Sequence, residues 1–189
     1  MKNIAILASH NGSGFSALYE ANINNELTIN IPIVISNNSD SKALEKAKEF
    51  GIENHTINKK LYENPDETIY KLIKEKNCEY IFLSGYMKKI SPILTDNFKI
   101  INAHPSLLPK YGGAGMYGIH VHNAVIKNKE KTSGVTIHEV NENYDEGKII
   151  LQKSLNVVDS DTPDSLESKI KKLEKKAIIE AFKDLLSSS

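Results

Sequence analysis

The chain has 189 residues, 40% of them hydrophobic, and is therefore long enough to bury a core of its own. Its 24 lysines and arginines balance 24 aspartates and glutamates, which argues against a general polyanion-binding protein. A single cysteine, Cys78, excludes an internal disulfide and fits a reducing compartment. Since no apolar run is long enough for a signal peptide or a membrane span, we expect a cytoplasmic protein.

Apolar runs alternate with segments of helical periodicity through the first two thirds of the chain. We expect strands at residues 4–8, within 27–36, and at 55–57, 80–83 and 98–101. Helices are expected between them at 15–22, 42–50 and 66–76, with Gly51 placed to cap the second one. This order predicts an α/β fold with a largely parallel sheet.

The last third of the chain has a different rhythm. A helix is expected at 121–127, followed by strands at 134–140 and 148–158 that are joined through an acidic turn. Two strands this close in sequence favour an antiparallel hairpin at the sheet edge. Pro163 is typical of the first turn of a final helix, which we expect to reach Leu186. Since no repeat or linker is visible, residues 1–189 are expected to form a single domain.

An amide and an imidazole stand close together where the strand at 98–101 ends. Asn102 and His104 are two residues apart, so an extended backbone places their side chains on one face. Pro105 follows directly and ends the strand. Ligands of open α/β sheets bind at this end of the strands, where an amide can stabilise an oxyanion and an imidazole can move a proton. For such a pair alone, ordinary turn residues are the simpler interpretation.

The full segment 102–110, NAHPSLLPK, resembles the signature of the folate-dependent formyltransferases. With the Asn-Gly-Ser sequence at 11–13, the chain resembles in particular the phosphoribosylglycinamide formyltransferases. The resemblance covers nearly the whole chain. It implies a Rossmann-like formyltransferase fold, with a mostly parallel sheet flanked by helices and an antiparallel C-terminal edge. It implies transfer of a formyl group from the cosubstrate 10-formyltetrahydrofolate to the amine of N1-(5-phospho-D-ribosyl)glycinamide, a step of de novo purine (IMP) biosynthesis. Expected partners are small molecules, without metal, nucleic acid or membrane. The oligomeric state stays open, with a homo-oligomer as one alternative.

The resemblance also implies how the reaction proceeds. The amine attacks the formyl carbon directly, while Asn102, His104 and Asp145 act as the catalytic residues that stabilise the tetrahedral intermediate. Asp145 lies in the acidic turn at 141–147, where a solvated turn is otherwise the ordinary interpretation. A carboxylate beside an imidazole favours its protonated form, which is the form that donates a proton.

A glycine-bearing turn, residues 9–14, joins the first strand to the first helix. Backbone amides at a helix N-terminus suit a phosphate, but a tight βα turn explains the pattern equally well. The turn lacks the third glycine of the dinucleotide fingerprint. By resemblance, Gly12, Ser13 and Gly14 hold the substrate phosphate, although Gly14 stands where the family commonly has asparagine.

The remaining binding residues are assigned by resemblance alone. Glu174 corresponds to a glutamate that reaches the amine substrate, whereas its lysine-rich surroundings by themselves predict a solvated helix face. Lys88 stands where arginine is frequent in the family, and Tyr86 where phenylalanine is frequent. The residues expected to bind folate are Met87, Lys88, Lys89, Ile90, Asn102, Asn141, Glu142, Asn143, Tyr144 and Asp145.

Several alternatives remain open at this point. Methionyl-tRNA formyltransferases share the Ser-Leu-Leu-Pro motif, but they add an RNA-binding domain. An amino-sugar nucleotide formyltransferase, a formyltetrahydrofolate hydrolase and a non-catalytic folate- or nucleotide-binding module are further candidates. The glycine-rich segment 112–118 fits either a lid or a connection, and no metal-ligand spacing is recognisable.

Overall fold

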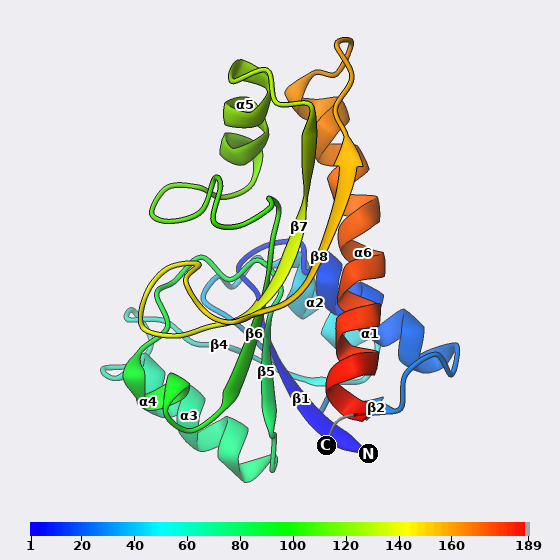
Figure 1. Cartoon of the computed structure of the whole chain (residues 1–189). Coiled ribbons are helices and arrows are strands. Elements are labelled where there is room, and N and C mark those ends of the chain that lie inside the picture. Colours follow the sequence, from blue (N-terminus) through cyan, green and yellow to red (C-terminus); the bar gives the residue numbers. More distant parts are fainter. Residues whose placement is uncertain (188–189) are drawn as a thin grey trace. The chain divides into compact units, whose positions relative to one another are not determined.

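The computed structural model describes residues 1–187 and divides within strand β6 into two compact units, residues 1–102 and the residues from Ala103 onward (Figure 1). The elements of the first unit are β1 (Lys2–Leu7), α1 (Ser13–Ile23), β2 (Ile29–Asn30), β3 (Ile33–Ser36), α2 (Lys42–Glu49), β4 (Glu53–Thr56), α3 (Pro65–Glu75), β5 (Tyr80–Leu83), α4 (Pro92–Thr95) and β6 (Lys99–His104). The second unit contains α5 (Ile119–Lys127), β7 (Thr132–Glu139), β8 (Ile149–Asn156) and α6 (Pro163–Ser187).

The first unit is built on parallel strands in the order β4-β3-β1-β5-β6, with β2 beside β1. Strands β3 and β5 are buried along their whole length, as expected for parallel strands covered on both faces. In the register, Leu7 of β1 lies opposite Ile35 of β3 and Leu83 of β5, and Leu83 in turn lies opposite Asn102. The loops that follow these strands therefore start from one edge of the sheet.

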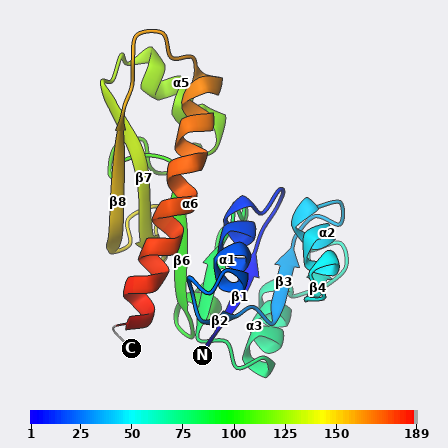
Figure 2. The same cartoon turned by 90° about the vertical axis from the view of Figure 1, so that its right-hand side faces the viewer.

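The second unit is an antiparallel hairpin covered by helices. Strands β7 and β8 pair from Thr132 opposite Asn156 to His138 opposite Ile149, with an irregularity after Ile137. Helix α6 packs along both strands and against α5, as Figures 1 and 2 show from two sides. The buried stripe of α6 consists of Leu166, Ile170, Ala177, Ile178, Ala181 and Phe182.

The α/β fold class is confirmed: parallel strands form the first unit and an antiparallel pair the second. The expected strand at 27–36 is two short strands, β2 and β3, interrupted at Pro32, which has no N–H to donate. Helix α4, which has only four residues, was not predicted from the sequence. Strand β6 continues to His104, beyond the expected end at Ile101, so Asn102 and His104 belong to the strand itself.

The single-domain interpretation of residues 1–189 stays a prediction, and its last two residues lie outside the described ones. Among residues 1–187, the helices are all too short or too polar to span a lipid bilayer.

Candidate active site

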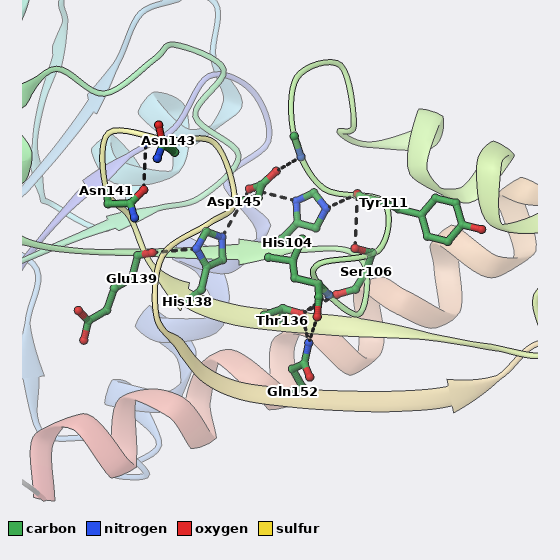
Figure 3. Close-up of polar contacts among 12 residues, drawn as sticks. His104, Ser106, Tyr111, Thr136, His138, Glu139, Asn141, Asn143, Asp145 and Gln152 are labelled. Atoms are coloured by element: carbon green, nitrogen blue, oxygen red, sulfur yellow. Dashed lines mark hydrogen bonds and ion pairs between the residues drawn. The ribbon is translucent and has the colours of Figure 1, made fainter.

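His104 ends β6 and is 4% exposed, and both of its ring nitrogens face oxygen atoms (Figure 3). Nε2 lies 2.8 Å from the Tyr111 carbonyl oxygen, and Nδ1 lies 3.5 Å from Oδ1 of Asp145. Because a carbonyl oxygen only accepts, Nε2 must carry a proton. Nδ1 can then donate toward the carboxylate only if the ring is doubly protonated. The geometry thus favours a positively charged His104.

Asp145 lies in the turn between β7 and β8, at a φ of 58°. Its Oδ2 accepts a hydrogen bond of 2.9 Å from the Gly113 amide, so both carboxylate oxygens face polar groups. Gly147 allows the close approach of the turn, because a Cβ there would lie 1.7 Å from the Glu139 carbonyl oxygen. The Asp145 carboxylate is therefore held by the Gly113 amide, and the turn that carries it packs closely against Glu139.

A second imidazole, that of His138 on β7, faces the same carboxylate oxygen. Its Nε2 lies 3.6 Å from Oδ1 of Asp145, and its Nδ1 lies 2.9 Å from the Glu139 carbonyl oxygen (Figure 3). Burial lowers the pKa of His138, while the Glu139 carbonyl and Asp145 act in the opposite direction. A neutral ring whose proton is given to Glu139 has none left for Asp145. The contacts therefore favour His104 as the charged partner.

Sequence reasoning did not identify His138. It lies in a strand whose apolar and polar residues alternate, and a histidine in such a strand is usually interpreted as a buried residue with its hydrogen bonds made. The only available signal was its position near the end of that strand, directly before the acidic turn.

The loop after His104 is held by a hydroxyl from β7. Thr136 Oγ1 donates to the Ser106 carbonyl (2.7 Å) and accepts from the Leu108 amide (3.0 Å). Gln152 Nε2 donates to both Thr136 Oγ1 and the Leu108 carbonyl, each at 2.9 Å. These bonds fix the path of the loop and so determine where the Tyr111 carbonyl meets His104.

The residues expected to bind folate differ in exposure. Met87, Lys88 and Lys89 of the first unit are exposed, with 42% of Met87 accessible, whereas Ile90 is buried and belongs to the core. Residues 141–144 of the second unit are exposed, including 54% of Tyr144. Asn102 is half-buried on β6.

The glycine-bearing turn enters α1 in a conformation that glycine favours. Gly12 has a φ of +59°, and a Cβ there would lie 2.7 Å from the Ala43 Cβ. The Phe15 amide is taken by Ser84 Oγ (2.9 Å), whereas the amides of Ser13 and Gly14 have no acceptor within residues 1–187. Lys46 Nζ, which sequence reasoning missed, donates to the Asn11 carbonyl at 2.8 Å. Two open amides and a cation thus lie at this turn.

Glu174 is half-buried on α6, in contrast to the solvated face that its composition predicts. Burial raises its pKa to about 7, and nearby Lys171 acts in the opposite direction. Burial also raises the pKa of the Cys78 thiol to about 12, so this cysteine stays protonated. Among the described residues, His, Cys, Asp and Glu side chains form no group of three placed to hold a metal ion. Metal independence stays a prediction.

Residues 2–182 match the family model described as formyl transferase. The chain belongs to this formyl transferase family. The family and the fold expected from the NAHPSLLPK segment are therefore confirmed. Among its relatives, phosphoribosylglycinamide formyltransferase of Bacillus subtilis is 34% identical over 191 residues, covering 98% of this chain and 95% of the relative. The Escherichia coli protein of the same name is 31% identical over 173 residues, covering 89% of this chain and 79% of that protein.

Solved structures of formyl transferase relatives agree with the fold. The crystal structure of phosphoribosylglycinamide formyltransferase from Bacillus halodurans has a TM-score of 0.90 at 30% identity, covering 98% of this chain and 96% of that one. The chain spans 63% and 61% of the chloroplastic phosphoribosylglycinamide formyltransferases of Arabidopsis thaliana and Vigna unguiculata, each 33% identical to it.

Proposed function

We propose that this formyl transferase moves the formyl group of 10-formyltetrahydrofolate to the amine of N1-(5-phospho-D-ribosyl)glycinamide, releasing tetrahydrofolate, as a step of purine synthesis in the cytoplasm. The names of relatives that align over nearly the full chain support the acceptor. The observation that carries the chemistry is the contact of Asp145 with His104, the histidine of the Asn-x-His pair on β6.

In the proposed reaction, the amine lone pair attacks the formyl carbon and negative charge develops on the formyl oxygen. The Asn102 amide and the His104 imidazolium donate hydrogen bonds to that oxygen. As the bond from the formyl carbon to the folate nitrogen breaks, that nitrogen takes up a proton and the attacking amine loses one. Asp145 keeps His104 charged throughout, and no covalent bond to the protein is formed.

The contact between His104 and Tyr111 implies a rearrangement before transfer. His104 Nε2 donates its hydrogen bond to the Tyr111 carbonyl. If this nitrogen is the donor in the reaction, the formyl oxygen must replace that carbonyl as acceptor. The segment that follows contains Gly113 and Gly115 at φ of 92° and 83°, values that glycine adopts freely. We therefore assign the displacement of the carbonyl to a change in the backbone of residues 111–118.

The binding residues fit the two substrates chemically. The open amides of Ser13 and Gly14, with Gly12, suit a phosphate dianion at a helix N-terminus. Glu174, with a pKa of about 7, can accept from the substrate amine when ionised. The exposed Met87 side chain in one unit and the exposed Tyr144 side chain in the other each offer an apolar surface of the kind that a flat pterin covers.

The proposal is tested by measuring initial rates of tetrahydrofolate formation with the ribonucleotide and with other amines, including methionyl-tRNA and an amino-sugar nucleotide. We expect the ribonucleotide to be preferred. His104→Ala should lower turnover by about 10²–10³-fold, the usual cost of an oxyanion donor, while 10-formylfolate still binds. Preference for another amine would overturn the acceptor, and unchanged turnover in the variant would remove His104 from the reaction.

A further inference from the structure

Ser9 lies two residues beyond β1, at the edge of the first unit where the loops after β1, β3 and β5 begin. Its side chain is fully buried, with 0% exposure. It is the first residue of the glycine-bearing turn at 9–14, here called the phosphate turn because Gly12, Ser13 and Gly14 are proposed to hold the phosphate, but its hydroxyl points to other segments of the unit. A buried hydroxyl normally has specific hydrogen-bond partners, and these partners show what it holds in place.

Ser9 binds the segment after β5 at two points. Its amide donates to the Gly85 carbonyl (3.1 Å), and its Oγ accepts from the Met87 amide (2.7 Å). The segment after β3 is also bound at two points. Ser9 Oγ donates to Asn37 Oδ1 (2.5 Å), and the Ser9 carbonyl accepts from Asn38 Nδ2 (2.7 Å). One residue thus connects the ends of three strands.

The direction of the Ser9 hydroxyl is determined by its neighbours. Asn37 Nδ2 donates to Asn38 Oδ1 (3.0 Å), which leaves Asn37 Oδ1 facing Ser9. An amide oxygen can only accept, so the single hydroxyl proton goes to Asn37. A lone pair of Ser9 Oγ is then left for the Met87 amide. The asparagine fixes the hydroxyl, and the hydroxyl fixes the main chain at Met87.

We infer that Ser9 is a positioning residue for the segment 87–90: its hydroxyl holds the Met87 main chain in place and so determines the affinity for the formyl donor without contacting it. The inference rests on the proposed function, in which this segment binds folate. It assigns to Ser9 a role in donor binding rather than in phosphate binding, although Ser9 is the first residue of the phosphate turn.

The effect should be selective because the hydroxyl bonds to the segments after β5 and β3, at Met87 and Asn37, and not to Gly12, Ser13 or Gly14. Ser9→Ala removes the bonds to Met87 and Asn37, but keeps the main-chain bonds to Gly85 and from Asn38. The phosphate turn has separate support: Ser41 Oγ donates to the His10 carbonyl (2.7 Å), and the Ala43 amide donates to the same oxygen (3.0 Å). Losing the Ser9 hydroxyl should therefore disturb donor binding and leave ribonucleotide binding nearly intact.

The test compares Ser9→Ala with the wild-type protein in three measurements: KM for 10-formyltetrahydrofolate, KM for the ribonucleotide, and Kd for 10-formylfolate by calorimetry. We expect the KM for the donor and the Kd to rise by up to about tenfold, the usual effect of losing one hydrogen bond. The KM for the ribonucleotide should change less than about threefold. Ser9→Cys keeps the size of the side chain but accepts hydrogen bonds weakly, and should be intermediate.

Ser41→Ala is the matched control, because it removes another buried serine hydroxyl that does not reach residues 85–90. It should leave the Kd for 10-formylfolate unchanged. Amide hydrogen exchange at Met87 should accelerate in Ser9→Ala but not in Ser41→Ala, and this readout does not depend on activity. Equal rises of both KM values, or an unchanged Kd in Ser9→Ala and Ser9→Cys, would overturn the inference. Failure of the wild-type protein to bind 10-formylfolate would instead overturn the proposed function.

Discussion

At the scale of single residues, two imidazoles compete for one carboxylate. His104 can satisfy both ring nitrogens only as an imidazolium, because one nitrogen faces the Tyr111 carbonyl and the other faces Asp145. His138 faces the same carboxylate oxygen, but its burial lowers its pKa and leaves it neutral near pH 7. The contacts therefore favour His104 as the ring that holds the proton in the proposed reaction.

Replacing Asp145 by asparagine tests this distribution of protons. Asp145→Asn keeps the shape of the side chain but removes the charge that favours protonated His104. We expect activity to be lost at lower pH on the alkaline side than in the wild-type protein, in a profile of kcat against pH. Asp159→Asn, which removes an exposed carboxylate paired with Lys131, is the control and should leave the profile unchanged. An alkaline limb that does not move in Asp145→Asn would contradict the pairing.

At the scale of elements, the N-terminus of α1 combines a residue needed for packing with the proposed phosphate site. Gly12 is required by packing, since any Cβ would meet Ala43 and the backbone φ is positive. A bulky residue at Gly12 would therefore test the fold as much as the phosphate. Ser13, the first residue of the helix, offers a better test because its amide is open.

Proline is well tolerated as the first residue of a helix and has no amide proton. Ser13→Pro should therefore raise the KM for the ribonucleotide by about tenfold or more, the usual value of a hydrogen bond to a charged group. Ser13→Ala keeps the amide and should change this KM by less than about threefold. Thermal unfolding of both variants checks that α1 remains intact. If the two variants have the same KM, the phosphate does not bind the Ser13 amide.

At the scale of the whole molecule, we expect two buried histidines to make stability depend on pH. His122 on α5 is 2% exposed, and His138 is 1% exposed. Burial is the main cause that lowers both pKa values; for His122, Glu167 opposes it and Lys171 adds to it. The unfolded chain therefore binds more protons than the folded protein once the pH falls below about 6.5.

We accordingly expect the free energy of unfolding to be constant above about pH 6.5 with respect to these groups, and to fall as the pH decreases toward their lowered pKa values. Each histidine contributes a slope of up to about 1.4 kcal/mol per pH unit. Urea unfolding between about pH 5 and 8 should show this loss. His122→Gln should reduce the slope, whereas replacing the exposed His10 by glutamine should not. An unchanged slope in His122→Gln would show that His122 does not titrate on unfolding.

The proposed reaction as a whole should proceed without a metal ion. Its oxyanion is stabilised by the Asn102 amide and the His104 imidazolium, so a Lewis acid has no assigned role. Extensive dialysis against a chelator should leave kcat unchanged, measured with the ribonucleotide and 10-formyltetrahydrofolate. Readdition of zinc or magnesium is the control. Loss of activity on chelation, followed by recovery with either metal, would contradict the proposed mechanism.

The sequence by itself determined the order of the elements and the family. Strand β5 was predicted to the residue, and α2 and α5 nearly so, because burial periodicity and capping residues are local properties. The NAHPSLLPK segment was sufficient for the family because its residues are contiguous. Elements that depend on distant partners were missed or misplaced: β6 continues through Asn102 to His104, although the apolar run that marks the strand ends at Ile101.

The tertiary structure alone decided which polar groups meet. Nothing local to Tyr111 indicates that its carbonyl faces His104, because that contact depends on a loop held by Thr136 and Gln152 from another part of the chain. The contacts of His138 with Asp145, and of Ser9 with Met87, likewise join residues that periodicity treats as unrelated. A sequence pattern reports which residues are buried, but the partner of a buried polar atom is determined by the path of the backbone around it.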